Sequence, residues 1–223
     1  MRLSGIKVVS FDAGGTLLTP KGSVGEVYAK VAAEQGLGLL DAAQLQRGFV
    51  DSWKAKRGFD YSRDAWRDLV ITSFASQCSA SEAIELFEPI YRRFARAEEW
   101  TVFEDVLPTL IALKSAGYRL VVLSNWDERL RPLLGELRLT EHFERLFISG
   151  EHGWHKPDRR LFDQMRNDMD CEPGEILHVG DSHDEDVNGA QAAGFQASHL
   201  DWRSNDPGTD SIASLETLLR MLK

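Results

Sequence analysis

The chain has 223 residues, of which 43% are hydrophobic and 27% charged, so its composition is that of an ordinary globular protein. Its 35 Asp and Glu residues outnumber its 26 Lys and Arg residues, which gives a formal net charge of −9. Lys and Arg never occur more than two in a row, so we expect no nucleic acid as a partner. The longest apolar runs are far shorter than the roughly 20 residues of a membrane span, so we expect no membrane as a partner.

The two cysteines, Cys78 and Cys171, lie far apart in the sequence and form no pair with metal-ligand spacing. Such sparse cysteine is typical of a reducing compartment, where disulfides are rare. The first five residues lead directly into a strand-like segment, without the apolar stretch of a signal peptide. We therefore expect a cytoplasmic protein.

Five short runs rich in Val, Ile and Leu predict strands that are buried on both faces of a parallel sheet. These runs are residues 6–11, 118–123, 145–148, 176–179 and 195–200. Helical patterns at 106–116, 159–168 and 185–193 separate the later runs, and the first and last of these patterns stop just before a glycine. The alternation of strand and helix predicts βαβ units and a doubly wound α/β sheet. After a predicted loop at 203–209, an amphipathic pattern predicts a last helix at 211–222.

Residues 19–100 differ from the rest because they contain no strand-like run. Their apolar spacing predicts several amphipathic helices. These helices are expected at 24–35, 42–54, 62–78 and 81–96. The simplest organisation is a helical insertion between the first strand and the strands that pair with it.

Polar clusters follow four of the predicted strands, where open α/β sheets bind their ligands. The clusters are Asp12-Ala13-Gly14-Gly15-Thr16, Ser124-Asn125, His155-Lys156-Pro157-Asp158 and residues 180–186. Each alone has a simpler explanation: a tight turn, a helix cap, a solvated lysine, or acidic residues that stabilise a helix N-terminus. Together they would bring a nucleophile, hydrogen-bond donors, a positive charge and a divalent-cation site to one edge of the sheet.

The four clusters in this order, with a helical insertion after the first, resemble the haloacid dehalogenase-like (HAD) hydrolase superfamily. The stretches 123–130 and 152–158 also resemble the subgroup named for haloacid dehalogenase-like hydrolase domain-containing protein three. The resemblance covers essentially the whole chain. It implies a Rossmann-like catalytic core of residues 1–16 and 101–223, and a helical cap of the C1 type at residues 17–100.

The resemblance also implies a metal site. Mg²⁺, a hard cation that prefers oxygen ligands, would lie between Asp12, the backbone carbonyl of Gly14 and Asp181. Asp186 would support this site from behind, directly or through water. The expected cofactor is therefore Mg²⁺.

Further roles follow from the same resemblance. Asp12 would be the nucleophile that attacks phosphorus and forms an aspartyl phosphate. Ser124, Asn125 and Lys156 would bind the oxygens of the transferring group, and Ser124 and Lys156 would also offset its charge in the transition state. Thr16 would hydrogen-bond the loop that carries Asp12 and orient it.

One position departs from the family pattern. Phosphatases of this superfamily usually carry a second Asp two residues after the nucleophile, where this chain has Gly14. That Asp acts as general acid toward the leaving group and then as base toward water, and its loss typically costs about 10²–10⁴-fold in rate, roughly 3–5 kcal/mol. Alkyl phosphates would suffer most, and aryl or acyl phosphates least, because their leaving groups need no proton.

Gly14 leaves three interpretations open. Another group, such as a cap residue, a bound water, His155 or His183, could replace the acid in a phosphatase. The protein could instead be a metal-independent hydrolase of the dehalogenase or phosphonatase type, the latter with Lys54 or Lys56 as a Schiff-base lysine. It could also be a catalytically weak protein that binds phosphate and Mg²⁺ or a partner.

The combination of Asp12, Lys156 and Asp181 favours the first interpretation, because a protein without catalysis has no need of all three. We therefore expect a Mg²⁺-dependent phosphatase of the HAD type. The expected ligand is a small phosphorylated metabolite, and the expected assembly is a monomer or a homodimer.

Overall fold

The computed structural model describes residues 3–203 and 211–222 and divides the chain into two compact units. The core unit consists of residues 1–19 and 102–223, and the helical unit consists of residues 20–101. These boundaries lie within three residues of the predicted ones, which follow residues 16 and 100.

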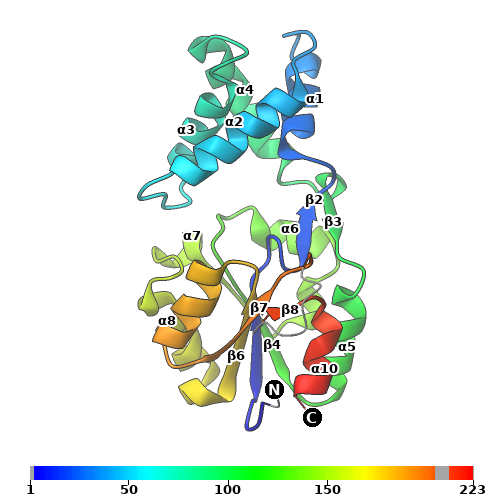
Figure 1. Ribbon diagram of the computed structural model, residues 1–223, viewed down its shortest axis with the longest axis vertical. Coiled ribbons are helices and arrows are strands. Elements are labelled where there is room, and N and C mark those ends of the chain that lie inside the picture. Colours follow the sequence, from blue (N-terminus) through cyan, green and yellow to red (C-terminus); the bar gives the residue numbers. More distant parts are fainter. Residues whose placement is uncertain (1–2, 204–210, 223) are drawn as a thin grey trace. The chain divides into compact units, whose positions relative to one another are not determined.

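The core unit contains a parallel sheet whose described strands lie in the order β5-β4-β1-β6-β7-β8 (Figure 1). The strands are β1 (Val8–Phe11), β4 (Arg119–Ser124), β5 (Arg145–Ile148), β6 (Ile176–Gly180), β7 (Gln196–Leu200) and β8 (Ser211–Ile212). Numbered by their occurrence in this sheet, they follow the order 3-2-1-4-5-6 of a doubly wound Rossmann-like fold. The predicted fold class is confirmed.

The register of the central strands aligns their carboxyl ends. Phe11, the last residue of β1, pairs with Val122 of β4 on one side and with Val179 of β6 on the other. The backbone N–H of Asp12 then donates to the carbonyl of Val179 at 2.9 Å, so the residue after β1 is still fixed to the sheet. The polar clusters that follow β1, β4 and β6 therefore lie side by side.

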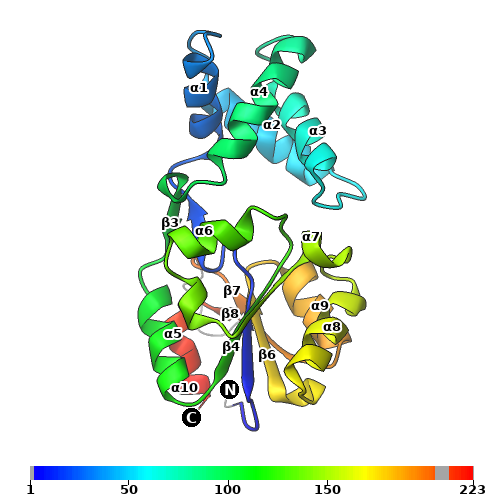
Figure 2. The same cartoon turned by 180° about the vertical axis from the view of Figure 1, so that it is seen from behind.

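Helices cover both faces of the sheet (Figures 1 and 2). They are α5 (Val106–Ser115), α6 (Leu130–Glu136), α7 (Ser149–His152), α8 (Arg159–Met169), α9 (Gly189–Ala192) and α10 (Leu218–Met221). Helices α5 and α10 lie on one face, and α8 and α9 on the other. Apolar residues of α8, such as Leu161 and Phe162, are fully buried against Val121 and Leu123 of β4. This burial follows from the continuous apolar sequence of the strand.

The last part of the chain differs from its prediction. Residues 211–222 do not form one helix: Ser211 and Ile212 form β8, which pairs with His199 and Leu200 of β7. Ser214 then has an extended backbone, and its hydroxyl accepts from the N–H of Glu216 to start the short helical turn that leads into α10. A strand of two residues is too short to show a periodic pattern. The predicted loop at 203–209 lies, from residue 204 onward, outside the described residues.

Three further differences concern local structure. The helix predicted at 185–193 begins as a π-helical segment, His183–Asn188, before continuing as α9. Short strands also occur at the ends of the helical insertion, where β2 (Leu18–Pro20) pairs with β3 (Trp100–Val102). Helices α6 and α7 were not predicted either, because seven and four residues give too little periodicity.

The described helical unit contains four α-helices at the predicted places. They are α1 (Val24–Glu34), α2 (Ala42–Ala55), α3 (Arg63–Phe74) and α4 (Ala80–Arg93). Each helix starts at a side-chain cap that accepts a backbone N–H; the caps are Ser23, Asp41, Ser62 and Ser79. The unit has its own apolar core, in which the rings of Tyr28 and Phe74 stack with centroids 5.3 Å apart.

The loop between α2 and α3 forms an aromatic cluster within the helical unit. Phe59 and Tyr61 pack edge-on against Trp53 and Trp66, with ring centroids 5.0–6.4 Å apart. The ammonium of Lys56, one of the two lysines considered for a Schiff base, lies 3.1 Å from the centroid of the Trp53 ring. These aromatic side chains therefore serve the packing of the helical unit.

Candidate active site

Asp12 lies at the carboxyl end of the central strand β1 and is only 8% exposed. The turn after it is closed by backbone hydrogen bonds from Leu17 to the carbonyl of Ala13 and from Gly15 to that of Leu18, both 2.8 Å. Gly15 has φ +77°, and a Cβ at this position would come within 2.3 Å of a carboxylate oxygen of Asp181. Only glycine fits here, because the turn needs a left-handed residue and the carboxylate occupies the adjoining space.

Lys156 connects the nucleophile candidate to a second carboxylate. Its side chain is 1% exposed, and its Nζ donates to Oδ1 of Asp12 at 2.6 Å and to Oδ1 of Asp186 at 2.5 Å. Asp186 is also buried and accepts two more hydrogen bonds, from the backbone N–H of Ser182 at 2.9 Å and from the ring of His178 at 3.0 Å. The three clusters that follow β1, β5 and β6 are thus joined by direct contacts.

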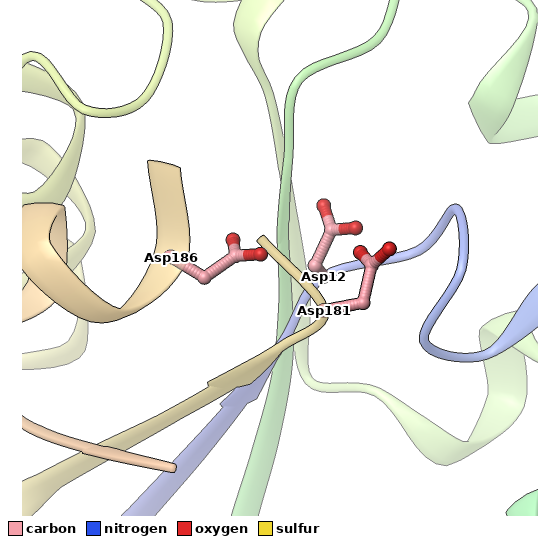
Figure 3. Close-up of side chains that lie close together, drawn as sticks. All are labelled: Asp12, Asp181 and Asp186. Atoms are coloured by element: carbon pink, nitrogen blue, oxygen red, sulfur yellow. The ribbon is translucent and has the colours of Figure 1, made fainter. Parts of the chain in front are cut away.

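Asp12, Asp181 and Asp186 converge at the sheet edge (Figure 3). Each offers a carboxylate oxygen, and these oxygens lie within 4.8 Å of one another. Asp181 as a residue is exposed, but its carboxylate turns inward over Gly15. The backbone carbonyl of Gly14 accepts no hydrogen bond from the described residues and remains available as a further oxygen ligand.

The three carboxylates of Asp12, Asp181 and Asp186 carry more negative charge than the nearby ammonium of Lys156 can balance. Burial raises the pKa of Asp12 to about 6, although the Lys156 ammonium acts in the opposite direction. Burial of its carboxylate, together with the charges of Asp12 and Asp186, raises the pKa of Asp181 to about 7. One ammonium does not balance three carboxylates. The residues therefore fit a hard divalent cation, which favours oxygen ligands and would keep these groups ionised.

Lys156 and Asp186 form the fixed ion pair of the site. Burial alone would raise the pKa of Asp186, but the Lys156 ammonium and the hydrogen bond from His178 hold it well below its usual range. Burial would likewise lower the pKa of Lys156, but the carboxylates of Asp12 and Asp186 hold it above its usual range. Lys156 is therefore charged wherever the protein is folded at ordinary pH.

Asn125 holds the backbone of Lys156. Its Oδ1 accepts from the N–H of Lys156 at 2.6 Å, and its Nδ2 donates to the carbonyl of Lys156 at 2.9 Å and to Glu185 at 3.0 Å. That Asn125 binds substrate stays a prediction. These contacts give its amide a positioning role, because they fix the residue that carries the ammonium.

Two hydroxyl groups were expected to act at this site. The Ser124 hydroxyl is buried and has no hydrogen-bond partner at normal geometry, yet it is close enough to Asp12 to help lower the pKa of that carboxyl. The hydroxyl of Thr16 is buried and makes no hydrogen bond to the described residues. Thr16 does hydrogen-bond the loop that carries Asp12, but through its backbone N–H, which donates to the carbonyl of Ala13 at 3.3 Å.

The ring of Trp126 fills the space beside Gly14. A Cβ at Gly14 would lie 3.1 Å from Cζ3 of the Trp126 ring, which is tighter than ordinary van der Waals contact. Trp126 was not predicted as a site residue, although it directly follows Ser124-Asn125. His178, a polar residue inside the apolar strand β6, was not predicted either.

His155 and His183, the two histidines considered as substitute acids, make the following contacts. Nδ1 of His155 lies 3.2 Å from the carbonyl of Lys156. His183 is exposed, and its ring packs against that of His199 with centroids 5.8 Å apart.

Among the residues the structure describes, no helix combines the length and apolar character needed to cross a membrane.

The chain is similar to known hydrolases of one family. The family model for haloacid dehalogenase-like hydrolases matches residues 6–194. Human haloacid dehalogenase-like hydrolase domain-containing protein 3 is 33% identical over 203 residues, which cover 86% of this chain and 80% of the human protein. This relative agrees with the subgroup resemblance seen in the sequence.

Two other relatives carry names of different activities. A glyceraldehyde 3-phosphate phosphatase from Methanothermobacter thermautotrophicus is 29% identical over 204 residues, 86% of this chain and 84% of that protein. A (S)-2-haloacid dehalogenase 1 from a Pseudomonas species is 30% identical over 217 residues, 93% of this chain and 89% of that protein.

Among solved structures, the Bacillus subtilis HAD-hydrolase YfnB, in a crystal form bound to magnesium, shares the fold with a TM-score of 0.80. It is 20% identical, and the match covers 100% of both chains. The match of the family model over most of the chain, together with these relatives, shows that the chain belongs to the haloacid dehalogenase-like hydrolase family.

Proposed function

We propose that this hydrolase is a Mg²⁺-dependent phosphatase that acts on a phosphorylated small molecule through an aspartyl phosphate at Asp12. The observation that carries the proposal is the buried contact of Lys156 with both Asp12 and Asp186, beside the carboxylate of Asp181. A nucleophilic carboxylate, an ammonium and an acidic cation site at one sheet edge are the groups that phosphoryl transfer requires.

In this proposal Asp12 attacks the phosphorus atom of the substrate. Lys156 holds Oδ1 of Asp12 in place and offsets negative charge as the phosphoryl group is transferred. The buried hydroxyl of Ser124 donates to an oxygen of that group. Asp12, Asp181, Asp186 and the carbonyl of Gly14 would hold Mg²⁺, which would supply the positive charge that balances the three carboxylates.

The acidic cluster separates this proposal from its main alternative. One relative is named a phosphatase and another a haloacid dehalogenase, so the family relationship supports both reactions. A metal-independent dehalogenation would use Asp12 as nucleophile but would give Asp181 no role. The convergence of the Asp181 carboxylate on Asp12 and Asp186, in a cluster that fits a divalent cation, therefore favours the phosphatase.

The test is hydrolysis of acetyl phosphate and p-nitrophenyl phosphate by the full chain, with Mg²⁺ and with EDTA, beside chloride release from 2-chloropropionate. We expect phosphate release that needs Mg²⁺ and that disappears in the Asp12→Asn variant. Asp163→Asn is a matched control, because Asp163 is a surface residue of α8 that pairs with Arg159.

The outcomes are distinct. Chloride release that persists in EDTA would establish the dehalogenase instead. Absence of turnover on every compound, in a protein that still binds Mg²⁺, would contradict the phosphatase and favour a binding protein.

The proposal includes a cytoplasmic monomer or homodimer. The cytoplasmic part is supported by the cysteines, since Cys78 and Cys171 are both free thiols, as is usual in a reducing compartment. Size-exclusion chromatography with light scattering gives the assembly directly, and a mass above that of two chains would contradict it.

A further inference from the structure

Trp126 occupies the place of a side chain that Gly14 lacks. A Cβ at Gly14 would meet Cζ3 of the ring at 3.1 Å, and Cε3 and Cη2 at 3.9 Å. A carboxymethyl group at position 14 would need far more room than a Cβ. The Trp126 ring therefore lies where a carboxylate at position 14 would otherwise lie, beside Asp12.

The backbone of Trp126 is held firmly. Its N–H donates to Oγ of Ser149 at 3.0 Å, while its carbonyl accepts from the same hydroxyl at 2.9 Å and from the N–H of Gly150 at 2.8 Å. The next residue, Asp127, is 2% exposed and forms an ion pair with Arg129. The ring can leave Gly14 only by rotation of its side chain, because three hydrogen bonds fix the backbone.

The chemical consequence concerns protons. The described residues place at position 14 neither an acid for the leaving group nor a base for water, and the Trp126 ring has no group that titrates near neutral pH. A leaving group that must be protonated as it departs is therefore disfavoured. The departure of a leaving group that is stable as an anion is not slowed by the missing acid.

We infer that Gly14 and Trp126 restrict this site to acyl phosphates and similarly activated donors, and that they make the aspartyl phosphate of Asp12 long-lived. The inference rests on the proposed phosphatase function and deepens it by naming the substrate class. Trp126 is then a specificity-determining residue, because its ring keeps an acid–base group and its water out of this space.

The two steps differ in their need for a proton acceptor. In the first, an oxygen of Asp12 bonds to phosphorus, the bond from phosphorus to the acyl oxygen breaks, and its electron pair stays on the departing carboxylate. In the second, water bonds to phosphorus, the bond from phosphorus to the Asp12 oxygen breaks with its electron pair staying on the Asp12 carboxylate, and a proton passes from the attacking water to bulk water. Only the second step needs a base, so it becomes the slow step and the phosphoenzyme accumulates.

The test is rapid-mix kinetics on the full chain with Mg²⁺, using acetyl phosphate and glycerol 3-phosphate. We expect an acetate burst of about one equivalent per Asp12, followed by slow turnover, and a preference for acetyl phosphate of about 10²–10⁴-fold. The double variant Gly14→Asp with Trp126→Ala is expected to remove the burst and to raise hydrolysis of glycerol 3-phosphate. Gly14→Asp alone is expected to do less, because the ring still fills the space.

Trp154→Ala is the matched control for loss of a tryptophan, because Trp154 is 39% exposed and packs on Arg160. Equal turnover of both compounds by the wild type without a burst would overturn the inference while leaving the phosphatase intact. Turnover that survives Asp12→Asn, or none at all, would instead contradict the proposed function. The wild-type measurements decide the matter even if the double variant does not fold.

Discussion

Nε2 of His178 lies 3.0 Å from Oδ1 of Asp186, and both side chains are buried beneath the candidate active site. Burial lowers the pKa of His178, so its ring is neutral near pH 7. A carboxylate can only accept, so Nε2 carries the proton, and Nδ1 accepts from the hydroxyl of Ser10 at 2.9 Å. A continuous hydrogen-bonded chain thus runs from Ser10 through His178 and Asp186 to Lys156 and Asp12.

Replacing the histidine should therefore destabilise the core unit. In His178→Leu the Asp186 carboxylate loses a buried donor and the Ser10 hydroxyl loses its acceptor. We expect the free energy of unfolding to fall by roughly 1–3 kcal/mol, measured by urea denaturation. His178→Gln keeps an amide that can donate and should recover part of the loss. Unchanged stability in His178→Leu would mean that this chain of hydrogen bonds does not support the fold.

Removing the lysine should have a larger effect. Lys156→Met leaves the buried carboxylates of Asp12 and Asp186 without their shared ammonium, and breaking a buried pair in this way typically costs about 3–5 kcal/mol. Mg²⁺ should restore part of this stability, while phosphate release stays abolished. The control is Lys7→Met, since Lys7 is 62% exposed in its pair with Glu175 and such surface pairs contribute roughly 0–1 kcal/mol. Similar losses in both variants would argue against the buried ion pair.

Asp181→Asn is expected to act in opposite directions with and without metal. In the metal-free protein it removes one charge from a crowded cluster, so the free energy of unfolding should rise. With Mg²⁺ at a hundred times its dissociation constant, the wild type should gain about 2.7 kcal/mol, and the variant should lose most of that gain. Urea denaturation with Mg²⁺ and with EDTA measures both effects. Asp184→Asn is the control in the same segment. If Mg²⁺ stabilised both variants equally, Asp181 would not be a Mg²⁺ ligand.

Asp158 provides a pH-dependent prediction away from the acidic cluster. It caps α8 by accepting the N–H of Arg160 at 2.9 Å, and hydrogen bonds from the Arg160 side chain and backbone lower its pKa to about 2. A lowered pKa gives stability above the unfolded value near 3.8, which is lost as the pH falls from about 4 to about 2. At pH 7 we expect Asp158→Ala to cost about 1 kcal/mol, and Asp158→Asn less because it retains the cap. A difference between wild type and Asp158→Ala that does not shrink on acidification would contradict this.

The sequence predicted most of the core because its signals are local or follow from topology. Asp12, Ser124 and Asp181 each follow a buried apolar run, and the carboxyl ends of parallel strands meet at one sheet edge. The contact of Lys156 with Asp12 and Asp186 is consistent with the family resemblance, which grouped these residues at one site.

The features that sequence reasoning missed depend on neighbours distant in the chain. Nothing near Trp126 indicates that its ring will lie on Gly14, since the contact arises only when β1 and β4 pair. His178 breaks an apolar strand pattern, but its hydrogen-bond partners Ser10 and Asp186 come from two other segments. The contact of Asn125 with the backbone of Lys156 has no local signal either, because the two residues lie 31 positions apart in the chain.

The position of β1 in the sheet also determines which parts of the core unit can open. β1 is paired on both sides, with β4 and β6, whereas β8 is a strand of two residues at the sheet edge. Local unfolding proceeds most readily from segments with few buried contacts. Fluctuations of β8 can therefore expose backbone amides there without disturbing the strand that carries Asp12, so the nucleophile stays in place while the edge of the sheet frays.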